Sequence, residues 1–180
     1  RMKRASDHNS RSRALTELQD LLNLPEAPLR IECYDMAHLQ GTDYVGSMVV
    51  LEDGLPIKRE YRKFKIKDVP GNDDYAAMKE VLTRRFARLQ KEDPDREKGD
   101  WPDLVLIDGG KGQVTQALEV LANLHARGAR GNRPKLAANV DGPRGLHVEG
   151  VDLAGAASHI KHDAAFARAP SFLGDCLGMR

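Results

Sequence analysis

The sequence LVLIDGGKGQ, residues 104–113, joins four apolar residues to an aspartate and then to a glycine-rich turn. A wholly apolar segment of this length is typical of a central strand that is covered on both faces. Functional groups in α/β sheets gather beyond such strand ends, where loops and helix N-termini converge. We therefore expect Asp108 to lie at a functional site, with a strand-end aspartate that has no chemical role as the alternative.

The turn GGKGQ at 109–113 allows two interpretations. Gly109 and Gly110 would let the backbone approach a phosphate closely, and Lys111 would add a positive charge. The turn lacks the G-x-x-x-x-G-K-[ST] spacing of a P-loop, so it gives little support to nucleotide binding. A tight strand-to-helix turn with a solvent-exposed lysine stays open as the alternative.

The rest of the chain predicts secondary structure in the order β-β-β-α-β-α, after a first helix. Alternating or wholly apolar segments predict strands at 29–35, 44–53, 59–67 and 104–108. Apolar residues spaced by three and four predict helices at 8–24, 74–90 and 113–124. Asp73 or Asp74 can cap the second of these helices. We expect an α/β fold with a mixed sheet, in which the first three strands form an antiparallel meander.

The pattern weakens after residue 125, where Gly, Ala and Arg are frequent and no firm period appears. Alanine contributes little apolar area to a core. We therefore predict a helical segment at 1–24, an α/β core at 25–125 and a divergent, truncated or loosely ordered tail at 126–180.

The composition is that of a globular domain, with 41% hydrophobic and 31% charged residues. No apolar run has the length of a membrane span, and the basic N-terminus lacks the apolar core of a signal peptide, so we expect a cytoplasmic protein and no membrane partner. The net charge of +1 does not indicate a nucleic-acid partner. Cys33 and Cys176 fit no metal-knuckle or disulfide framework. Because the chain begins at Arg1, we expect a fragment of a longer protein.

Three aspartates stand where an α/β sheet places functional groups. Asp35 ends the first strand, Asp108 ends the fourth, and Asp74 begins the helix between them. Adjacent carboxylates raise each other's pKa unless a cation lies between them, and hard oxygen ligands suit Mg²⁺ or Mn²⁺. Such an ion can position a water for phosphodiester hydrolysis. The alternative is that each aspartate only ends a strand or caps a helix.

The stretch KREYRKFKIK, residues 58–67, concentrates basic residues on one predicted strand and interleaves them with Tyr61 and Phe64. Such a strand can follow a phosphate backbone and stack bases on its rings. An ordinary solvated strand whose lysines prevent aggregation is the alternative.

Three runs of the sequence closely resemble the C-terminal endonuclease domain found in the C component of bacterial excinuclease ABC. They are RIECYDMAHLQGTDYVGSMVV at 30–50, YRKFKIKDVPGNDDYAAMKEVLTRRF at 61–86 and LVLIDGGKGQ at 104–113. The resemblance covers about residues 3–124, and the motifs occur in the family's order. It implies a ribonuclease H-like fold, with which the β-β-β-α-β-α order is consistent.

The resemblance also implies roles for single residues. Asp35, Asp74 and Asp108 correspond to the aspartates of the family's C-[FY]-D, D-D-Y and D-G-G-K-G-Q motifs, which look like metal-binding catalytic acids. Asp35 and Asp108 would bind the Mg²⁺ or Mn²⁺ ion between them. The basic residues that would face DNA are Arg62, Lys63, Lys65 and Lys111.

The sequence departs from the family at a histidine that a late helix supplies to the active site. The nearest stretch is HIKHDAAFARA at 159–169, which places Ala165 at the histidine position. His159 and His162 are close but out of register. One hypothesis is that a foreign or frameshifted tail follows a truncated domain, which would keep metal binding and lose much of the turnover.

The family makes the incision 5′ to a DNA lesion in nucleotide excision repair, together with excinuclease subunits A and B. The resemblance therefore implies a metal-dependent endodeoxyribonuclease that acts on damaged double-stranded DNA, in which a metal-activated water attacks the phosphodiester. The alternative is an impaired DNA-binding or docking module with the same fold.

Overall fold

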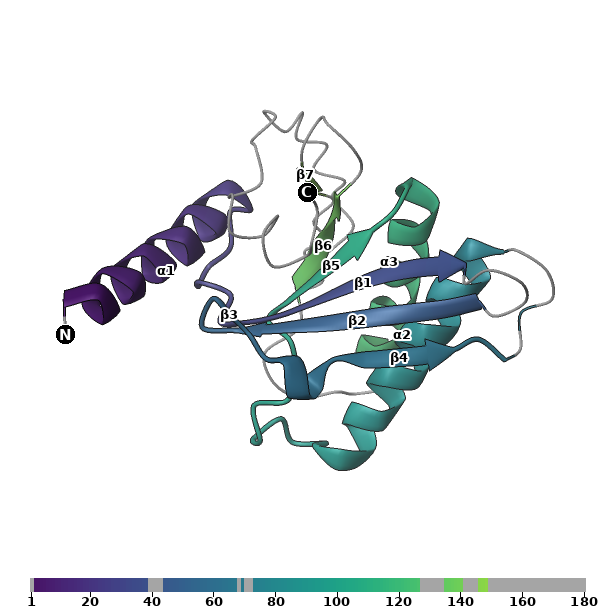
Figure 1. Ribbon diagram of the computed structural model, residues 1–180. Helices are drawn as coiled ribbons and strands as arrows, with labels where there is room; N and C mark the ends of the chain where they lie inside the picture. Colours follow the sequence, from purple (N-terminus) through teal and green to yellow (C-terminus); the bar gives the residue numbers. More distant parts are fainter. Residues whose placement is uncertain are drawn as a thin grey trace.

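The computed structural model describes residues 2–38, 44–67, 69, 73–126, 135–140 and 146–148 (Figure 1). In chain order the elements are α1 (Met2–Leu21), β1 (Arg30–His38), β2 (Tyr44–Glu52), β3 (Leu55–Pro56), the 3₁₀ turn η1 (Lys58–Glu60), β4 (Arg62–Lys65), α2 (Asp74–Glu92), β5 (Leu104–Asp108), α3 (Lys111–Ala126), β6 (Lys135–Val140) and β7 (Leu146–Val148). Within these residues no helix is long and apolar enough to cross a bilayer.

The described strands form one mixed sheet in the order β3-β2-β1-β5-β6-β7, with β4 also paired to β2. β1 runs antiparallel to β2 and parallel to β5. The apolar part of β5, Leu104 to Ile107, is fully buried in the middle of the sheet. The structure thus confirms the predicted α/β class, the mixed sheet and the central place of the LVLID strand.

The predicted third strand at 59–67 is wrong in its extent, because the structure divides this region. Asp53 and Gly54 form a tight turn with positive φ, which suits a two-residue hairpin, and β3 then pairs with the end of β2. The chain next makes the turn η1, and only Arg62–Lys65 returns to β2 as β4. The meander is confirmed, but its third strand is interrupted where Glu60 turns inward to bond Arg30.

Helices cover the two faces of the sheet unequally. α2 and α3 pack on one face over a core that includes Tyr34, Met48 and Ile107, and we call this the α2 face. α1 packs on the other face, the α1 face, against Ile31 and Cys33. The apolar residues of β1 and β5 that α1 contacts lie in the first part of each strand, before the aspartates.

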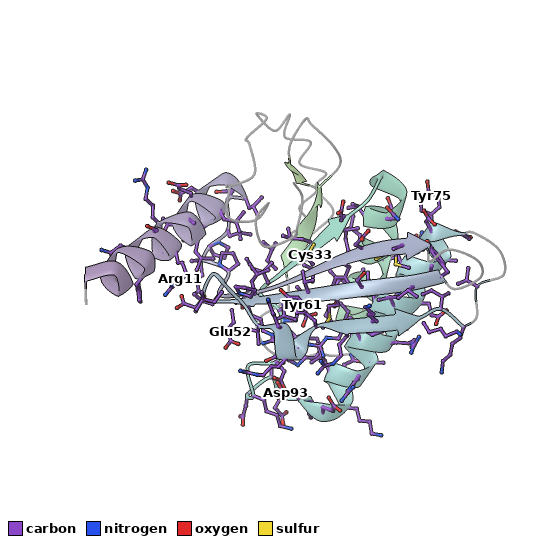
Figure 2. The ribbon with its side chains drawn as sticks, viewed as in Figure 1. Arg11, Cys33, Glu52, Tyr61, Tyr75 and Asp93 are labelled. Carbon is purple, nitrogen blue, oxygen red and sulfur yellow. The ribbon has the colours of Figure 1, made fainter. Side chains whose placement is uncertain are left out.

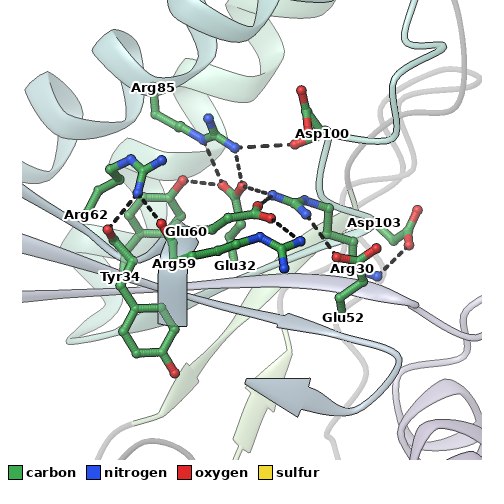
Figure 3. Close-up of polar contacts among 11 residues, drawn as sticks. Arg30, Glu32, Tyr34, Glu52, Arg59, Glu60, Arg62, Arg85, Asp100 and Asp103 are labelled. Atoms are coloured by element: carbon green, nitrogen blue, oxygen red, sulfur yellow. Dashed lines mark hydrogen bonds and ion pairs between the residues drawn. The ribbon is translucent and has the colours of Figure 1, made fainter. Parts of the chain in front are cut away.

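A buried ionic cluster joins the first residues of β1 to α2 (Figure 3). The carboxylate of Glu32 is fully buried and accepts hydrogen bonds from Tyr34 Oη at 2.6 Å and Arg85 Nη2 at 2.5 Å. Burial and the neighbouring charge of Glu32 raise the pKa of Tyr34, so the phenol stays protonated and donates. Arg30 extends the cluster to Glu60 of η1 and to Glu52 at 3.6 Å.

The Arg30–Glu60 pair predicts a pH-dependent stability. The hydrogen bond from Arg30 lowers the pKa of Glu60 from its ordinary value of 4.5. This stabilisation is therefore fully present above pH 4.5 and is lost as the pH falls through the lowered value. We expect Glu60→Gln to unfold with a free energy about 1–3 kcal/mol lower than the parent at pH 7. Urea titrations across pH should show the two proteins converging below pH 4.5, whereas a constant difference would contradict the account.

The sheet continues beyond the predicted core boundary at residue 125. β6 pairs parallel to β5, and β7 pairs antiparallel to β6. The segment KLAANV of β6 carries little of the β-branched and aromatic signal that marks strands, so its sequence alone did not reveal it. The helix predicted at 8–24 is α1, which begins at Met2 and ends at Leu21.

Candidate active site

Asp35 and Asp108 lie directly beside each other on two central strands of the sheet, β1 and β5. β1 and β5 are parallel neighbours, and their register pairs Asp35 with Asp108. The preceding residues of both strands that share this face, Cys33 and Leu106, pack under α1. Both aspartates therefore lie on the α1 face, just past the part of it that α1 covers. The sequence-based expectation that these two side chains are neighbours is confirmed.

The electrostatics of the neighbouring groups agree with this placement. Burial, followed by the negative charges of Asp108 and Asp35, raises the pKa of the Cys33 thiol to about 12. Loss of solvent around its carboxyl group raises the pKa of Asp35, and the Met36 amide offsets part of this effect. A carboxylate pair of this kind is stabilised by a cation between its members.

Asp73 and Asp74 have different tasks at the start of α2. Asp73 caps the helix, because its side chain accepts hydrogen bonds from the amides of Tyr75 and Ala76, each at 3.0 Å. Asp74 is exposed and accepts a hydrogen bond from the hydroxyl of Tyr44 at the start of β2. Capping therefore needs only Asp73, which leaves Asp74 available for the phenol contact.

Tyr44 links Asp74 to the aspartate pair. Burial, the hydrogen bond and charge of Asp74, and the charges of Asp73 and Asp35 all raise the pKa of the Tyr44 phenol. Asp35 and Asp74 thus act on the same hydroxyl from different elements. Among the described residues, however, no group of three or more histidine, cysteine, aspartate or glutamate side chains is close enough to hold one metal ion.

The GGKGQ turn forms the N-terminus of α3. The amide of Gly110 donates to Oε1 of Gln113 at 2.8 Å, and the amide of Gln113 donates back to the Gly110 carbonyl at 3.0 Å. This reciprocal pair resembles a capping box with glycine at the N-cap position. Gln113 is buried, so the turn fixes the start of α3 immediately after Asp108.

Gly109 has no room for a side chain, and this predicts a strong effect of a single methyl group. A Cβ at Gly109 would lie 1.6 Å from Oε1 of Gln113, whereas a Cβ at Gly110 would meet no atom within 4 Å. We expect Gly109→Ala to lower the free energy of unfolding by about 1–3 kcal/mol, because the buried Gln113 must leave its place. Thermal unfolding measures this, with Gly110→Ala as the matched control. Equal stability of the two variants would contradict the packing described for the turn.

Two of the predicted DNA-binding lysines share the face of the aspartates. The register of β4 on β2 places Lys63 opposite Ser47, which is itself opposite Asp35. Opposite residues of antiparallel strands point to the same face, so Lys63 and, two residues on, Lys65 lie on the α1 face. Both are exposed.

The other members of the basic strand have different surroundings. Arg62 lies opposite Met48 on the α2 face, and its Nη1 donates to the carbonyls of Arg59 and Tyr61, each at 2.9 Å. Phe64 packs against the core beneath Arg84, so the expected stacking of bases on Phe64 is not supported by its placement. The side chain of Lys111 is outside the described part of the structure.

Sequence reasoning missed Ser47, which lies opposite Asp35, and Tyr44, which binds Asp74. Their places depend on how β2 registers with β1 across residues 39–43, and no local pattern sets that register. The expected histidine cannot be placed, because His159, His162 and Ala165 all lie outside the described residues.

The described carboxylates fit a hard divalent cation in part. Asp35 and Asp108 offer oxygen ligands from adjacent strands, in register with each other. Mg²⁺ commonly binds through one or two carboxylates and keeps several waters or substrate phosphate oxygens as its other ligands. The pair therefore suits Mg²⁺ or Mn²⁺ without a third protein ligand.

Comparison with known proteins places this site in a family. Residues 19–130 match the family model described as UvrC RNase H endonuclease domain. The UvrABC system protein C of Novosphingobium aromaticivorans is 52% identical over 122 residues, which cover 68% of this chain and 18% of that protein. The protein of the same name from Solibacter usitatus is 60% identical over 111 residues, which cover 61% of this chain and 17% of that protein. The chain spans about a fifth of the length of these curated relatives.

Among solved structures, human endonuclease V is similar at 16% identity and a TM-score of 0.38, over 64% of this chain and 55% of that chain.

Proposed function

Since the chain belongs to the family of UvrC RNase H endonuclease domains, with the ribonuclease H-like fold of that family, we propose that it is a metal-dependent DNA endonuclease. It would make the incision 5′ to a lesion in nucleotide excision repair. The observation that supports this proposal most is the register of Asp35 with Asp108 on adjacent parallel strands. The substrate would be damaged double-stranded DNA, with excinuclease subunits A and B as partners that recognise the lesion.

Asp35 and Asp108 would hold a Mg²⁺ or Mn²⁺ ion between the adjacent central strands β1 and β5. When bound, such an ion supplies Lewis-acid stabilisation of phosphate charge and lowers the pKa of a bound water. Asp74 has a positioning role in this proposal, because it accepts a hydrogen bond from Tyr44, whose phenol also feels the charge of Asp35. The buried Gln113 fixes the turn that follows Asp108 and thereby limits how far this carboxylate can move.

The sheet register suggests the path of a DNA strand. Asp108, Asp35, Ser47 and Lys63 form one row across β5, β1, β2 and β4. Because neighbouring strands are about 4.8 Å apart, Lys63 starts about 10 Å from Asp35. This distance corresponds to about three steps of about 3.4 Å along the axis of a DNA duplex. Lys63 and Lys65 would therefore bind phosphates a few nucleotides from the cleaved bond.

Lys63 tests this path. We expect Lys63→Ala to weaken DNA binding uniformly across sequences and to reduce the slope of log K against log salt by about 1, since one phosphate contact is lost. Fluorescence anisotropy at several salt concentrations measures both effects. Lys91→Ala is the matched control, because Lys91 is an exposed lysine in the last turn of α2, far from Asp74. An unchanged slope for Lys63→Ala would remove Lys63 from the DNA path.

The function itself is tested by incubating the purified chain with supercoiled plasmid and Mn²⁺, beside Asp35→Ala. We expect nicking by the parent and none by the variant. Nicking by both proteins would show that the activity does not come from this site.

One observation favours the alternative of an impaired DNA-binding or docking module. Among the described residues no group of three or more histidine, cysteine, aspartate or glutamate side chains could hold a metal ion, and the histidine position of the family corresponds to Ala165. Such a module would bind the plasmid and leave it intact in Mn²⁺. The same plasmid assay therefore separates the two functions.

A further inference from the structure

The ring of Tyr75 is an exposed aromatic surface at the start of α2, directly after Asp74. Tyr75 is 55% exposed, while the apolar residues that follow it on α2, Ala77 and Met78, are fully buried. Figure 2 shows Tyr75 projecting outward at the end of the sheet toward which β1 points. Neither the capping of α2 nor the core packing uses this ring, because Asp73 bonds only its backbone amide.

The ring has a fixed seat on α3. A Cβ at Gly112 would lie 2.3 Å from Cε1 and 2.5 Å from Cζ of Tyr75, so the ring rests against the backbone of Gly112. This contact joins the start of α2 to the start of α3, four residues after Asp108. A ring that is supported on one side and exposed elsewhere loses little conformational entropy when a flat ligand stacks on it.

The neighbours of Tyr75 define the chemistry of a ligand. Asp74 precedes it and bonds Tyr44, whose phenol also feels the charge of Asp35. The ring thus follows Asp74 directly in the chain and lies against the start of α3, four residues after Asp108, where it presents an uncharged surface. Every nucleobase has a π face that stacks on tyrosine, and such contacts tolerate any sequence.

We propose that Tyr75 stacks on an unpaired DNA base next to the phosphodiester that the aspartates address, with Gly112 as the seat of the ring. This inference rests on the proposed function, because it takes DNA as the substrate. Tyr75 then positions the strand beside Asp35 and Asp108, while Lys63 and Lys65 bind its phosphates further along the row.

The test measures binding of the full chain to a short fluorescent duplex with a central unpaired bubble, in Ca²⁺. We expect Tyr75→Ala to bind about tenfold more weakly, as is typical of a lost base–aromatic stack, and Tyr75→Phe to bind as the parent does. Gly112→Ala should also weaken binding, because its methyl group occupies the place of the ring. Leu55→Ala is the matched control, since Leu55 is a similarly exposed apolar residue on β3, at the other end of β2.

Abasic substitutions in the bubble identify the stacked base. One abasic position should weaken binding by the parent as much as Tyr75→Ala does, and should cost nothing further in Tyr75→Ala, because both changes remove the same contact. Two results would overturn this inference and leave the proposed function standing. One is that Tyr75→Ala binds the duplex as tightly as the parent does. The other is that, at every position, an abasic site weakens binding by Tyr75→Ala as much as it weakens binding by the parent. Failure of the parent to bind the bubbled duplex would overturn the proposed function and the inference with it.

Discussion

Asp108→Asn should abolish Mn²⁺-dependent nicking of supercoiled plasmid, with a fall in rate of about a thousandfold or more. The substitution keeps the shape of the side chain and removes one of the two adjacent negative charges that would hold the ion. Metal stabilisation of a transition state is worth several kcal/mol, and each increment of about 1.36 kcal/mol is a factor of ten in rate. Gel quantification of nicked and supercoiled plasmid over time gives the rate.

A charge control and a folding control make this result specific to the site. Asp95→Asn removes one negative charge from an exposed loop after α2 and should nick at the parental rate. The buried neighbours of Asp108, Leu106 and Ile107, are untouched, so the thermal unfolding of Asp108→Asn should stay close to that of the parent. A parental nicking rate for Asp108→Asn would remove Asp108 from the mechanism.

Arg85→Met should lower the free energy of unfolding by about 3–5 kcal/mol, since it leaves the fully buried carboxylate of Glu32 without its closest positive partner. Arg30 pairs with Glu32 more loosely, with its Nη2 3.9 Å from Oε1, and the same Nη2 is already engaged by Glu60. Urea denaturation measures the loss. The double variant Glu32→Gln, Arg85→Met should lose less than the sum of the single variants, because the unpaired charge is gone.

Arg88→Met is the matched control for this prediction. Arg88 lies three residues further along the same helix, but its side chain is 63% exposed and pairs with the exposed Glu92 at 2.9 Å. An exposed pair of this kind contributes about 1 kcal/mol or less. Similar losses for Arg88→Met and Arg85→Met would show that the buried cluster does not have the stabilising role described here.

The sequence was sufficient to predict the parts of the fold that local patterns determine. LVLID is apolar throughout because β5 is covered on both faces, and the stripe of α2 is buried as its spacing predicts. The split of the third strand was not predictable in this way. It depends on Glu60 reaching Arg30, which lies 30 residues earlier in the chain. β6 was missed because its side chains carry a weak strand preference.

The sequence predicted some residues of the candidate site but not how they are arranged. The sequence marked Asp35 and Asp108 as aspartates at strand ends, but their pairing depended on β1 and β5 being neighbours, which the sheet register supplies. The roles of Asp73 and Asp74 could not be separated from the sequence, since either aspartate can cap a helix. Tyr44 enters the site only through the register of β2, and Tyr75 only through the packing of α2 on α3.

Calorimetric titration with Mn²⁺ tests most directly whether the two paired aspartates form a metal site. The proteins to compare are the parent, Asp35→Asn, Asp108→Asn and Asp95→Asn. Adjacent carboxylates in register predict that the parent and Asp95→Asn bind Mn²⁺ alike and that each of the other two variants loses most of the affinity. Parental affinity in either Asp35→Asn or Asp108→Asn would contradict the account, because the ion would then be held elsewhere.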